Sequence, residues 1–201
     1  MPLNAVALNC TLTPSPAASS TELLARQVLD ALAQHDVEGT IVRVVDRDVR
    51  PGVELDMGNG DQWPQIRGLI MASDILVLAT PTWMGQQSSV AQRVFERLDA
   101  ELSQTDDRGR LQTNGKVAVA VIVGNEDGAH HITGVTLQCL NDVGFTIPAG
   151  GAVYWNGEAM HTTDYKDLEE TPEKVATTTK TLAANAAHLA SLLKSNAYPA
   201  A

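Results

Sequence analysis

Short apolar runs alternate with amphipathic stretches along most of the chain. Runs rich in Val, Ile, Leu and Ala are typical of buried strands, whereas apolar residues spaced three and four positions apart predict helices. The strongest strand pattern, residues 74–80, is apolar on both faces, as in a central parallel strand covered by helices on each side. The predicted strands are 5–8, 40–45, 74–80, 116–123 and 146–153, and the predicted helices are 21–34, 62–73, 88–102, 129–143 and 171–194.

Strands that alternate with helices predict a parallel, right-handed, doubly wound sheet. Five strands at this spacing favour the flavodoxin-like order 2-1-3-4-5 over a six-stranded dinucleotide-binding fold. The sequence has no G-x-G-x-x-G after the first strand and no G-x-x-x-x-G-K-[ST] anywhere. We therefore predict an α/β, three-layer sandwich with a five-stranded parallel sheet, as a single domain over residues 1–195 with a flexible tail over 196–201.

Composition and net charge limit which partners and which kinds of site this chain is expected to have. The 201 residues are 44% hydrophobic, which is enough for a full core. The formal net charge of −10 disfavours nucleic acid and anionic membranes, because both require a field of Lys and Arg. We expect a cytoplasmic protein, since we find neither a leader pattern nor an apolar run of membrane-spanning length. Cys10 and Cys139 are too few for a disulfide framework or a four-thiolate metal site.

Three polar loops follow predicted strands and hold most of the candidate chemistry. Residues 11–21 follow the first strand, residues 81–86 the third and residues 124–131 the fourth. In an open α/β sheet, ligands bind outside the carboxyl ends of the strands, where the strand order reverses. The three loops therefore predict one composite pocket, and the long connections 46–60 and 154–171 favour an enclosed substrate.

The first loop suits a phosphate, although no Lys or Arg lies between Cys10 and Leu24. The available donors are hydroxyl groups, free amides at the helix N-terminus and the helix dipole. The two prolines of the loop have no amide proton to donate. The alternative is a Ser-rich solvent loop with an ordinary helix cap. The candidate residues are Thr11, Thr13, Ser19, Ser20 and Thr21.

The second loop suits a planar ring and the third loop suits the ring's polar edge. Trp83 lies at the carboxyl end of a strand in a chain that is only 4% aromatic. Alternatively, Trp83 covers the core edge or fills a subunit interface. Asn125 and the neighbouring glycine backbone can meet amide and carbonyl groups of a heterocycle, whereas Glu126 and Asp127 alternatively cap the next helix. The candidate residues are Pro81, Thr82, Trp83, Met84, Gly85, Gly124, Asn125, Glu126, Asp127 and Gly128.

Other polar residues carry weaker hypotheses. We predict no metal site, because the adjacent His130 and His131 diverge on a helix and a divalent ion needs ligands from several elements. Trp155 and His161 are candidates for the border of a substrate pocket, the alternative being rim or interface residues. The sequence has no G-x-S-x-G elbow and no Ser-His-Asp context to support hydrolysis, and we find no candidate general acid or base.

At these loops the chain resembles the flavodoxin-like NAD(P)H-dependent oxidoreductases, which include FMN reductases and quinone reductases. The segments that carry the resemblance are 8–12 with 19–21, 79–86 and 124–131, and the spacing of strands and loops matches over roughly residues 3–194. The chain departs from the family in its proline-bearing first loop. It also carries Ser20 where relatives often have Asn.

The resemblance implies FMN in the crevice, with its phosphate on Thr11 and residues 19–21 and its isoalloxazine against residues 81–85. It also implies a hydride from NADH or NADPH, a quinone-like or other small acceptor, and a homodimer or homotetramer. The flavin would supply the chemistry, and the Met84 and Gly85 amides would stabilise charge on the reduced ring. Two alternatives stay open: a flavodoxin-type electron-transfer protein, or a flavin-free binding module on the same fold.

Overall fold

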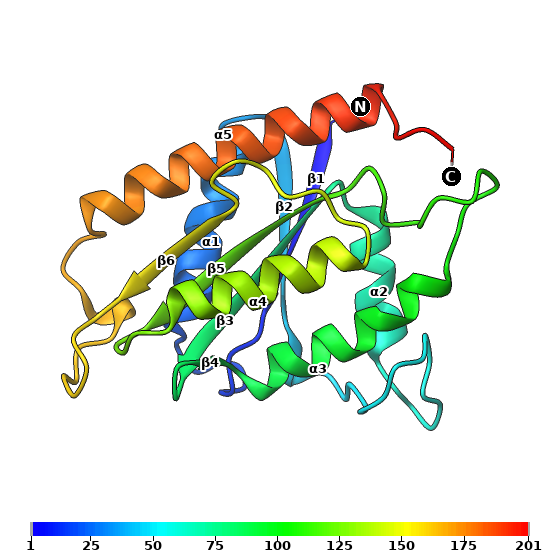
Figure 1. Ribbon diagram of the computed structural model, residues 1–201. Helices are drawn as coiled ribbons and strands as arrows, with labels where there is room; N and C mark the ends of the chain where they lie inside the picture. Colours follow the sequence, from blue (N-terminus) through cyan, green and yellow to red (C-terminus); the bar gives the residue numbers. More distant parts are fainter. Residues whose placement is uncertain (1, 201) are drawn as a thin grey trace.

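A computed structural model (Figure 1) describes residues 2–200, so Met1 and Ala201, the outer ends of the predicted domain and tail, lie outside the described residues. Its strands are β1 (Leu3–Asn9), β2 (Val37–Arg43), β3 (Ile75–Trp83), β4 (Gln86–Gln87), β5 (Val117–Gly124) and β6 (Ala152–Asn156). Its helices are α1 (Ser20–Ala33), α2 (Trp63–Ala72), α3 (Ser89–Leu98), α4 (Ala129–Asp142) and α5 (Glu173–Ser195), with short 3-10 helices η1 (Val44–Asp46), η2 (Asp99–Ser103) and η3 (Tyr165–Asp167).

The five long strands run parallel in the order β2-β1-β3-β5-β6, and β4 pairs with β3 in antiparallel fashion. This order confirms the predicted flavodoxin-like topology, with β5 and β6 as the predicted fourth and fifth strands. Helices cover both faces of the sheet, which makes three layers (Figure 1). The strand order reverses between β1 and β3, so the carboxyl ends of these two strands mark the expected ligand crevice.

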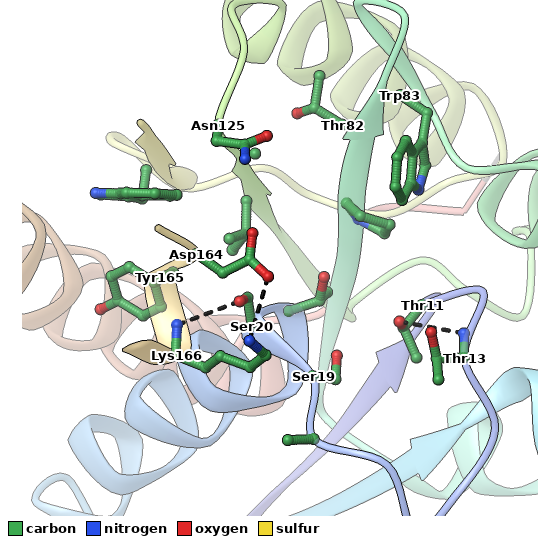
Figure 2. Close-up of a pocket in the computed structure, with 16 residues that line it drawn as sticks. Thr11, Thr13, Ser19, Ser20, Thr82, Trp83, Asn125, Asp164, Tyr165 and Lys166 are labelled. Atoms are coloured by element: carbon green, nitrogen blue, oxygen red, sulfur yellow. Dashed lines mark hydrogen bonds and ion pairs between the residues drawn. The ribbon is translucent and has the colours of Figure 1, made fainter. Parts of the chain in front are cut away.

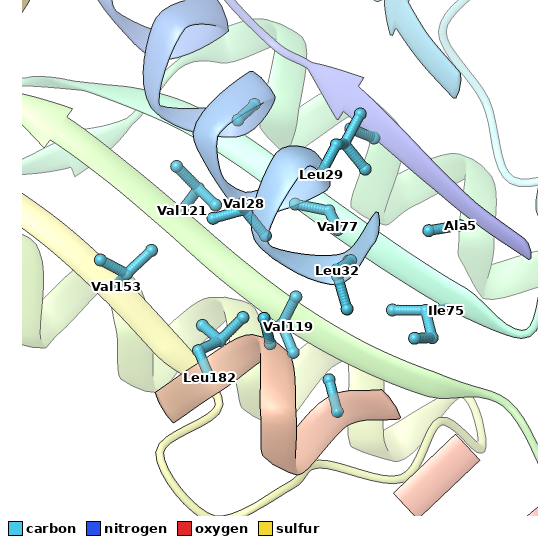
Figure 3. Close-up of a cluster of buried hydrophobic side chains, with 14 of the residues drawn as sticks. Ala5, Val28, Leu29, Leu32, Ile75, Val77, Val119, Val121, Val153 and Leu182 are labelled. Carbon is cyan, nitrogen blue, oxygen red and sulfur yellow. The ribbon is translucent and has the colours of Figure 1, made fainter. Parts of the chain in front are cut away.

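The strand over residues 75–83 is apolar at successive positions because both of its faces are buried. Successive side chains of a strand point to opposite faces of the sheet. Ile75 and Val77 join the cluster under α1 and α5 (Figure 3), whereas Leu76 and Leu78 join the cluster under α2 and α3. The sheet therefore lies between two hydrophobic cores, and packing on both of its faces holds its carboxyl edge in place.

Two of the predicted strands have different bounds in the structure. The predicted strand 146–153 is β6 at 152–156, because Thr146 makes only an isolated bridge to Val117 and a turn through Gly150, at a φ of 67°, precedes the strand. The predicted strand 40–45 is β2, which starts at Val37 and ends before η1. Most residues at the start of β2 are exposed at the edge of the sheet, so they lack the apolar pattern of a buried strand.

The structure also revises the bounds of one predicted helix and adds contacts outside the helices and strands. The predicted helix 88–102 ends as an α-helix at Leu98 and continues as η2. Thr113, in the connection between η2 and β5, is fully buried, and its hydroxyl donates to the Val143 carbonyl. In the predicted tail, the Tyr198 hydroxyl lies 2.9 Å from Oγ1 of Thr146.

A buried ion pair holds the long connection between β2 and α2 against α3. Nη1 of Arg97 lies 2.7 Å from Oδ2 of Asp61, and both side chains are fully buried. Arg97 also donates to the carbonyls of Glu54 and Arg50. Burial raises the pKa of Asp61, but hydrogen bonds from backbone amides and from Arg97 outweigh burial and lower that pKa to about 2. Asp61 therefore stays ionised down to strongly acidic pH.

Residues 2–200 contain neither a membrane-spanning helix nor a cluster of metal-binding side chains. No described helix combines the length and the apolar character that crossing a membrane requires. The described His, Cys, Asp and Glu side chains form no group of three that is able to hold a metal ion.

Candidate functional site

A pocket of about 320 Å³ lies where β1, β3 and β5 end, and all three predicted loops reach it (Figure 2). The convergence follows from the parallel register, which brings these carboxyl ends to one edge of the sheet. From the predicted set, the pocket is lined by Thr11, Thr13, Ser19, Ser20, Thr21, Pro81, Thr82, Trp83, Gly124, Asn125 and Trp155.

The first loop is held in place by a side chain from the neighbouring strand. Nη1 of Arg43 donates to the Ala17 carbonyl at 2.8 Å and to the Thr13 carbonyl at 3.3 Å. The same guanidinium pairs with Glu22 in the first turn of α1. Burial raises the pKa of Glu22, but hydrogen bonds from Arg43 and Arg26 outweigh burial and hold that pKa below its ordinary value. A fixed ion pair thus sets the path of the loop into α1.

The N-terminus of α1 presents hydrogen-bond donors to the pocket. The Ser19 hydroxyl caps the helix by accepting from the Glu22 amide at 3.2 Å. The first amides of a helix have no intrahelical acceptor, and those of Ser20 and Thr21 have no other partner among the described residues. Free amides at the positive end of a helix dipole suit an anion.

The second loop is a tight hairpin, which the sequence analysis did not predict. β3 continues to Trp83, turns through Met84 and Gly85, and pairs back through Gln86. Met84 and Gly85 have φ values of 53° and 71°, so both adopt the left-handed region that a two-residue hairpin turn requires. Methionine is an unusual residue for this conformation, so the turn has no recognisable sequence pattern. The hairpin places Trp83, 54% exposed, at the pocket rim.

The third loop packs against this hairpin, and four of the predicted residues take part in the contact. The Met84 amide donates to Oε1 of Glu126 at 2.9 Å. A Cβ on Gly128 would lie 2.8 Å from Cα of Gly85, so only a glycine allows this approach. The predicted donor role of the Met84 amide toward a ring is therefore wrong for this structure, because Glu126 accepts from that amide. Five predicted residues of these two loops do not line the pocket: Met84, Gly85, Glu126, Asp127 and Gly128.

The alternative role of Glu126 and Asp127 as helix caps is also absent from the structure. The N-cap of α4 is Gly128, which makes no side-chain capping hydrogen bond. Further along the turn, Nε2 of His131 lies 2.9 Å from Oε1 of Gln86. The third loop is therefore organised by its contacts with the hairpin rather than by the helix that follows it.

Of the two candidate border residues, one lines the pocket. Trp155 lies within β6, and its ring packs on Tyr165 with centroids 5.5 Å apart. The side chain of His161 is 65% exposed and pairs with Glu158. Only the His161 carbonyl approaches the site, where it accepts from Nδ2 of Asn125 at 3.0 Å. His161 therefore supports a pocket residue through its backbone and does not border the cavity.

Five lining residues were missed by the sequence analysis. Ala18 and Val123 are apolar neighbours of predicted residues and carried no chemical signal. Asp164, Tyr165 and Lys166 come from the connection 154–171, which was expected to enclose a substrate. Nothing in that connection indicated which of its many polar residues would face the cavity. The complete set of missed residues is Ala18, Val123, Asp164, Tyr165 and Lys166.

The donor set fits a phosphorylated, planar heterocycle. Free amides at the start of α1 suit a phosphate. Trp83 and Trp155, which suit a planar ring, line the same pocket. Oγ1 of Thr82 is buried and has no hydrogen-bond partner among the described residues. A buried polar atom without a partner is costly, so a hydrogen bond to Thr82 from a bound molecule would be favourable.

The family follows from the sequence. A sequence model of the NADPH-dependent FMN reductases matches residues 4–159. The chain belongs to this family. An 8-demethyl-8-aminoriboflavin-5'-phosphate synthase from Streptomyces davaonensis is 32% identical over 210 residues, which cover 98% of this chain and 81% of that enzyme. Family and relative together make this chain a flavin-related oxidoreductase enzyme.

A second relative is much longer than this chain. A divalent metal cation transporter from Mycobacterium bovis is 35% identical over 202 residues, which cover 97% of this chain but 30% of the transporter. The chain thus corresponds to less than a third of that protein, whose name describes the whole molecule.

Solved structures agree with the family. The crystal structure of RosB with bound 8-demethyl-8-formylriboflavin-5'-phosphate has a TM-score of 0.88 and 31% identity, covering 98% of this chain and 82% of that chain. An archaeal flavodoxin, at 10% identity and a TM-score of 0.60, covers 94% of this chain and 99% of its own length. The flavodoxin comparison shows the fold alone.

Proposed function

We propose that this reductase binds FMN in the pocket and uses NADPH or NADH to reduce a quinone-like or other small acceptor. One observation carries the proposal: a helix N-terminus with free amides, an aromatic rim and a partnerless Thr82 hydroxyl line the same cavity. Bound FMN would supply the redox chemistry by accepting a hydride from the nicotinamide and passing electrons to the acceptor.

The residues of the chain would bind and orient the flavin. The Ser20 and Thr21 amides and hydroxyl groups would hold the phosphate, and Thr82 would donate to or accept from a polar group of the ligand. Trp83 and Trp155 would cover the ring and exclude water. Trp83 is exposed at the rim of the pocket, so the nicotinamide and the acceptor would enter in turn from this side.

The visible spectrum of the protein as purified, repeated after anaerobic NADPH or NADH, tests this proposal. We expect flavin absorbance that bleaches with at least one nicotinamide and returns when a quinone is added. Flavin that is bleached only with a separate reductase would identify an electron-transfer protein instead. A colourless protein that gains no flavin bands with added FMN would identify a flavin-free binding module.

The match to the Streptomyces davaonensis synthase supports a second candidate function. That relative is named for a product modified on the flavin itself, and RosB was crystallised with a flavin phosphate called an intermediate. We infer that a riboflavin phosphate is then the substrate rather than a retained cofactor. Mass spectrometry of FMN after incubation with the enzyme in air and an added amino donor distinguishes the two functions, because a reductase leaves the flavin mass unchanged.

Replacing Ser20 and Thr21 together by Ala is expected to weaken FMN binding about tenfold and riboflavin binding much less, because hydrogen bonds to a charged phosphate are the stronger ones. Fluorescence titrations with both flavins give the two dissociation constants. The matched control replaces Thr177 and Thr178 in α5, which lie outside the pocket. Equal losses for both flavins would contradict a phosphate at this helix end.

We also propose that copies of the chain pair as dimers or tetramers. Met84 is 90% exposed and Trp83 is 54% exposed, so an apolar surface lies beside the pocket. Exposed apolar surface of this kind favours an interface. Sedimentation velocity of the purified protein is expected to give a mass of two or four chains, and a monomer at micromolar concentration would refute the pairing.

A further inference from the structure

A short segment outside the family match forms one wall of the pocket. We call residues 164–167 the strap; they follow the matched range 4–159 in the sequence. The Lys166 amide donates to the Ser20 hydroxyl at 3.2 Å, and the Tyr165 hydroxyl donates to Oε1 of Gln27 at 2.6 Å. Both contacts bind the strap to the first turns of α1. The strap is therefore fixed next to the free amides of Ser20 and Thr21.

The strap brings a positive charge to a site that otherwise has none. Among the described residues that line the pocket, Lys166 is the one cation. Figure 2 shows Lys166, Asp164 and Ser20 grouped on the same wall. Nζ of Lys166 lies 3.2 Å from Oδ2 of Asp164 and 2.5 Å from Oδ2 of Asp167. An ammonium has three donors, so these two pairs leave one donor for a ligand.

The carboxylates of Asp164 and Asp167 make the positive charge of Lys166 more important for binding an anion. Asp164 also lines the pocket, and its negative charge opposes an anionic ligand. Lys166 offsets this charge while it is present, and the side chain is only 30% exposed, so solvent screens it incompletely. Hydrogen bonds to Asp167 and Asp164 raise the pKa of Lys166, which keeps the ammonium protonated at neutral pH. Without the lysine, the Asp164 carboxylate in the wall and the Asp167 carboxylate behind it would be unpaired and would repel a phosphate.

We propose that Lys166 is a specificity-determining residue that selects flavins carrying a 5'-phosphate over unphosphorylated flavins. The inference rests on the proposed function, since it assigns a role within the same flavin site. Neutral donors at the start of α1 bind the phosphate oxygens but do not neutralise the phosphate's negative charge. Lys166 compensates that negative charge. The residue thus supplies the cation that the first loop lacks between Cys10 and Leu24.

The test compares K166Q, K166R and the matched control K180Q, which removes the same charge from an exposed position of α5 outside the pocket. Fluorescence titration gives dissociation constants for FMN and riboflavin. We expect K166Q to weaken FMN binding about tenfold and riboflavin binding by less than about twofold. K166R, which keeps the charge, is expected to restore most of the preference, and K180Q to leave both constants unchanged.

Each other outcome overturns the inference. Equal losses for FMN and riboflavin in K166Q would assign Lys166 a structural role in holding the strap. An unchanged flavin preference with a rise in KM for NADPH but not NADH would place the recognised phosphate on the nicotinamide cofactor. Wild-type binding of FMN with no effect of K166Q would refute the inference and leave the proposed function standing. Wild-type protein that binds neither flavin would refute both.

Discussion

Replacing Arg97 by Met is expected to lower the free energy of unfolding by about 3–5 kcal/mol, because the change leaves a buried carboxylate without its cation. Arg97 and Asp61 are both fully buried at 2.7 Å. The same guanidinium satisfies the carbonyls of Glu54 and Arg50, which would lose their donor. Methionine keeps much of the apolar stem, so the loss reports the charge and the hydrogen bonds rather than a large cavity.

Urea unfolding followed by circular dichroism measures this loss. The control is R26M, since Arg26 pairs with Glu22 one helical turn away but is 55% exposed, and such pairs contribute about 0.5 kcal/mol or less. A loss in R97M no larger than that in R26M would show that the buried pair is not a major stabilising contact. Flavin binding by the folded fraction is expected to persist, because neither Arg97 nor Asp61 lines the pocket.

Acid unfolding of the wild-type protein gives a second measure of the same pair. The pKa of Asp61 is lowered to about 2 from an ordinary value of 3.8. A carboxyl group with a lowered pKa stabilises the fold fully above its unfolded value, and this contribution is lost as the pH falls through the folded value. The contribution of Asp61 is therefore expected to disappear between about pH 4 and pH 2.

Replacing Gly128 by Ala is expected to reduce NAD(P)H oxidation at least about tenfold, by moving the third loop away from the hairpin. Gly128 has a φ of 133°, and its added Cβ would lie 2.8–3.0 Å from backbone atoms of Gly85. These Gly85 atoms belong to the backbone and not to a flexible side chain. The strain of about 1–3 kcal/mol is therefore relieved only by shifting the backbone. The shift would pull Glu126 from the Met84 amide and move Asn125, which lines the pocket.

Gly134 offers a matched control within α4, the helix that Gly128 precedes. A Cβ there meets nothing within 4 Å, and Ala is preferred over Gly in a helix by about 0.5–1 kcal/mol. G134A is therefore expected to keep wild-type activity and to raise the melting temperature, whereas G128A lowers both. Steady-state oxidation rates and thermal unfolding of the two variants test this contrast. Wild-type activity in G128A would mean that the loop contact does not position the site.

Local hydrophobic patterns were sufficient to predict the central strands of the sheet, because these strands are buried on both faces. A strand such as residues 75–83 must be apolar at successive positions, so its sequence is distinctive without any knowledge of its partners. The chain order of strands and helices then restricts the topology to a few right-handed arrangements. The edge strand β2 and the short β6 were placed less accurately, because exposed residues carry no such constraint.

The sequence by itself determined the fold, the edge of the sheet where the site lies, and the first-loop and strand-end residues that line it. These follow from local periodicity and from the polar residues after each strand. Only the tertiary structure decided that Glu126 accepts from the Met84 amide and that Lys166 faces the cavity. The physical reason is separation along the chain. The Lys166 contact joins residues 146 positions apart, and the direction of a side chain in a loop depends on distant partners that no local pattern encodes.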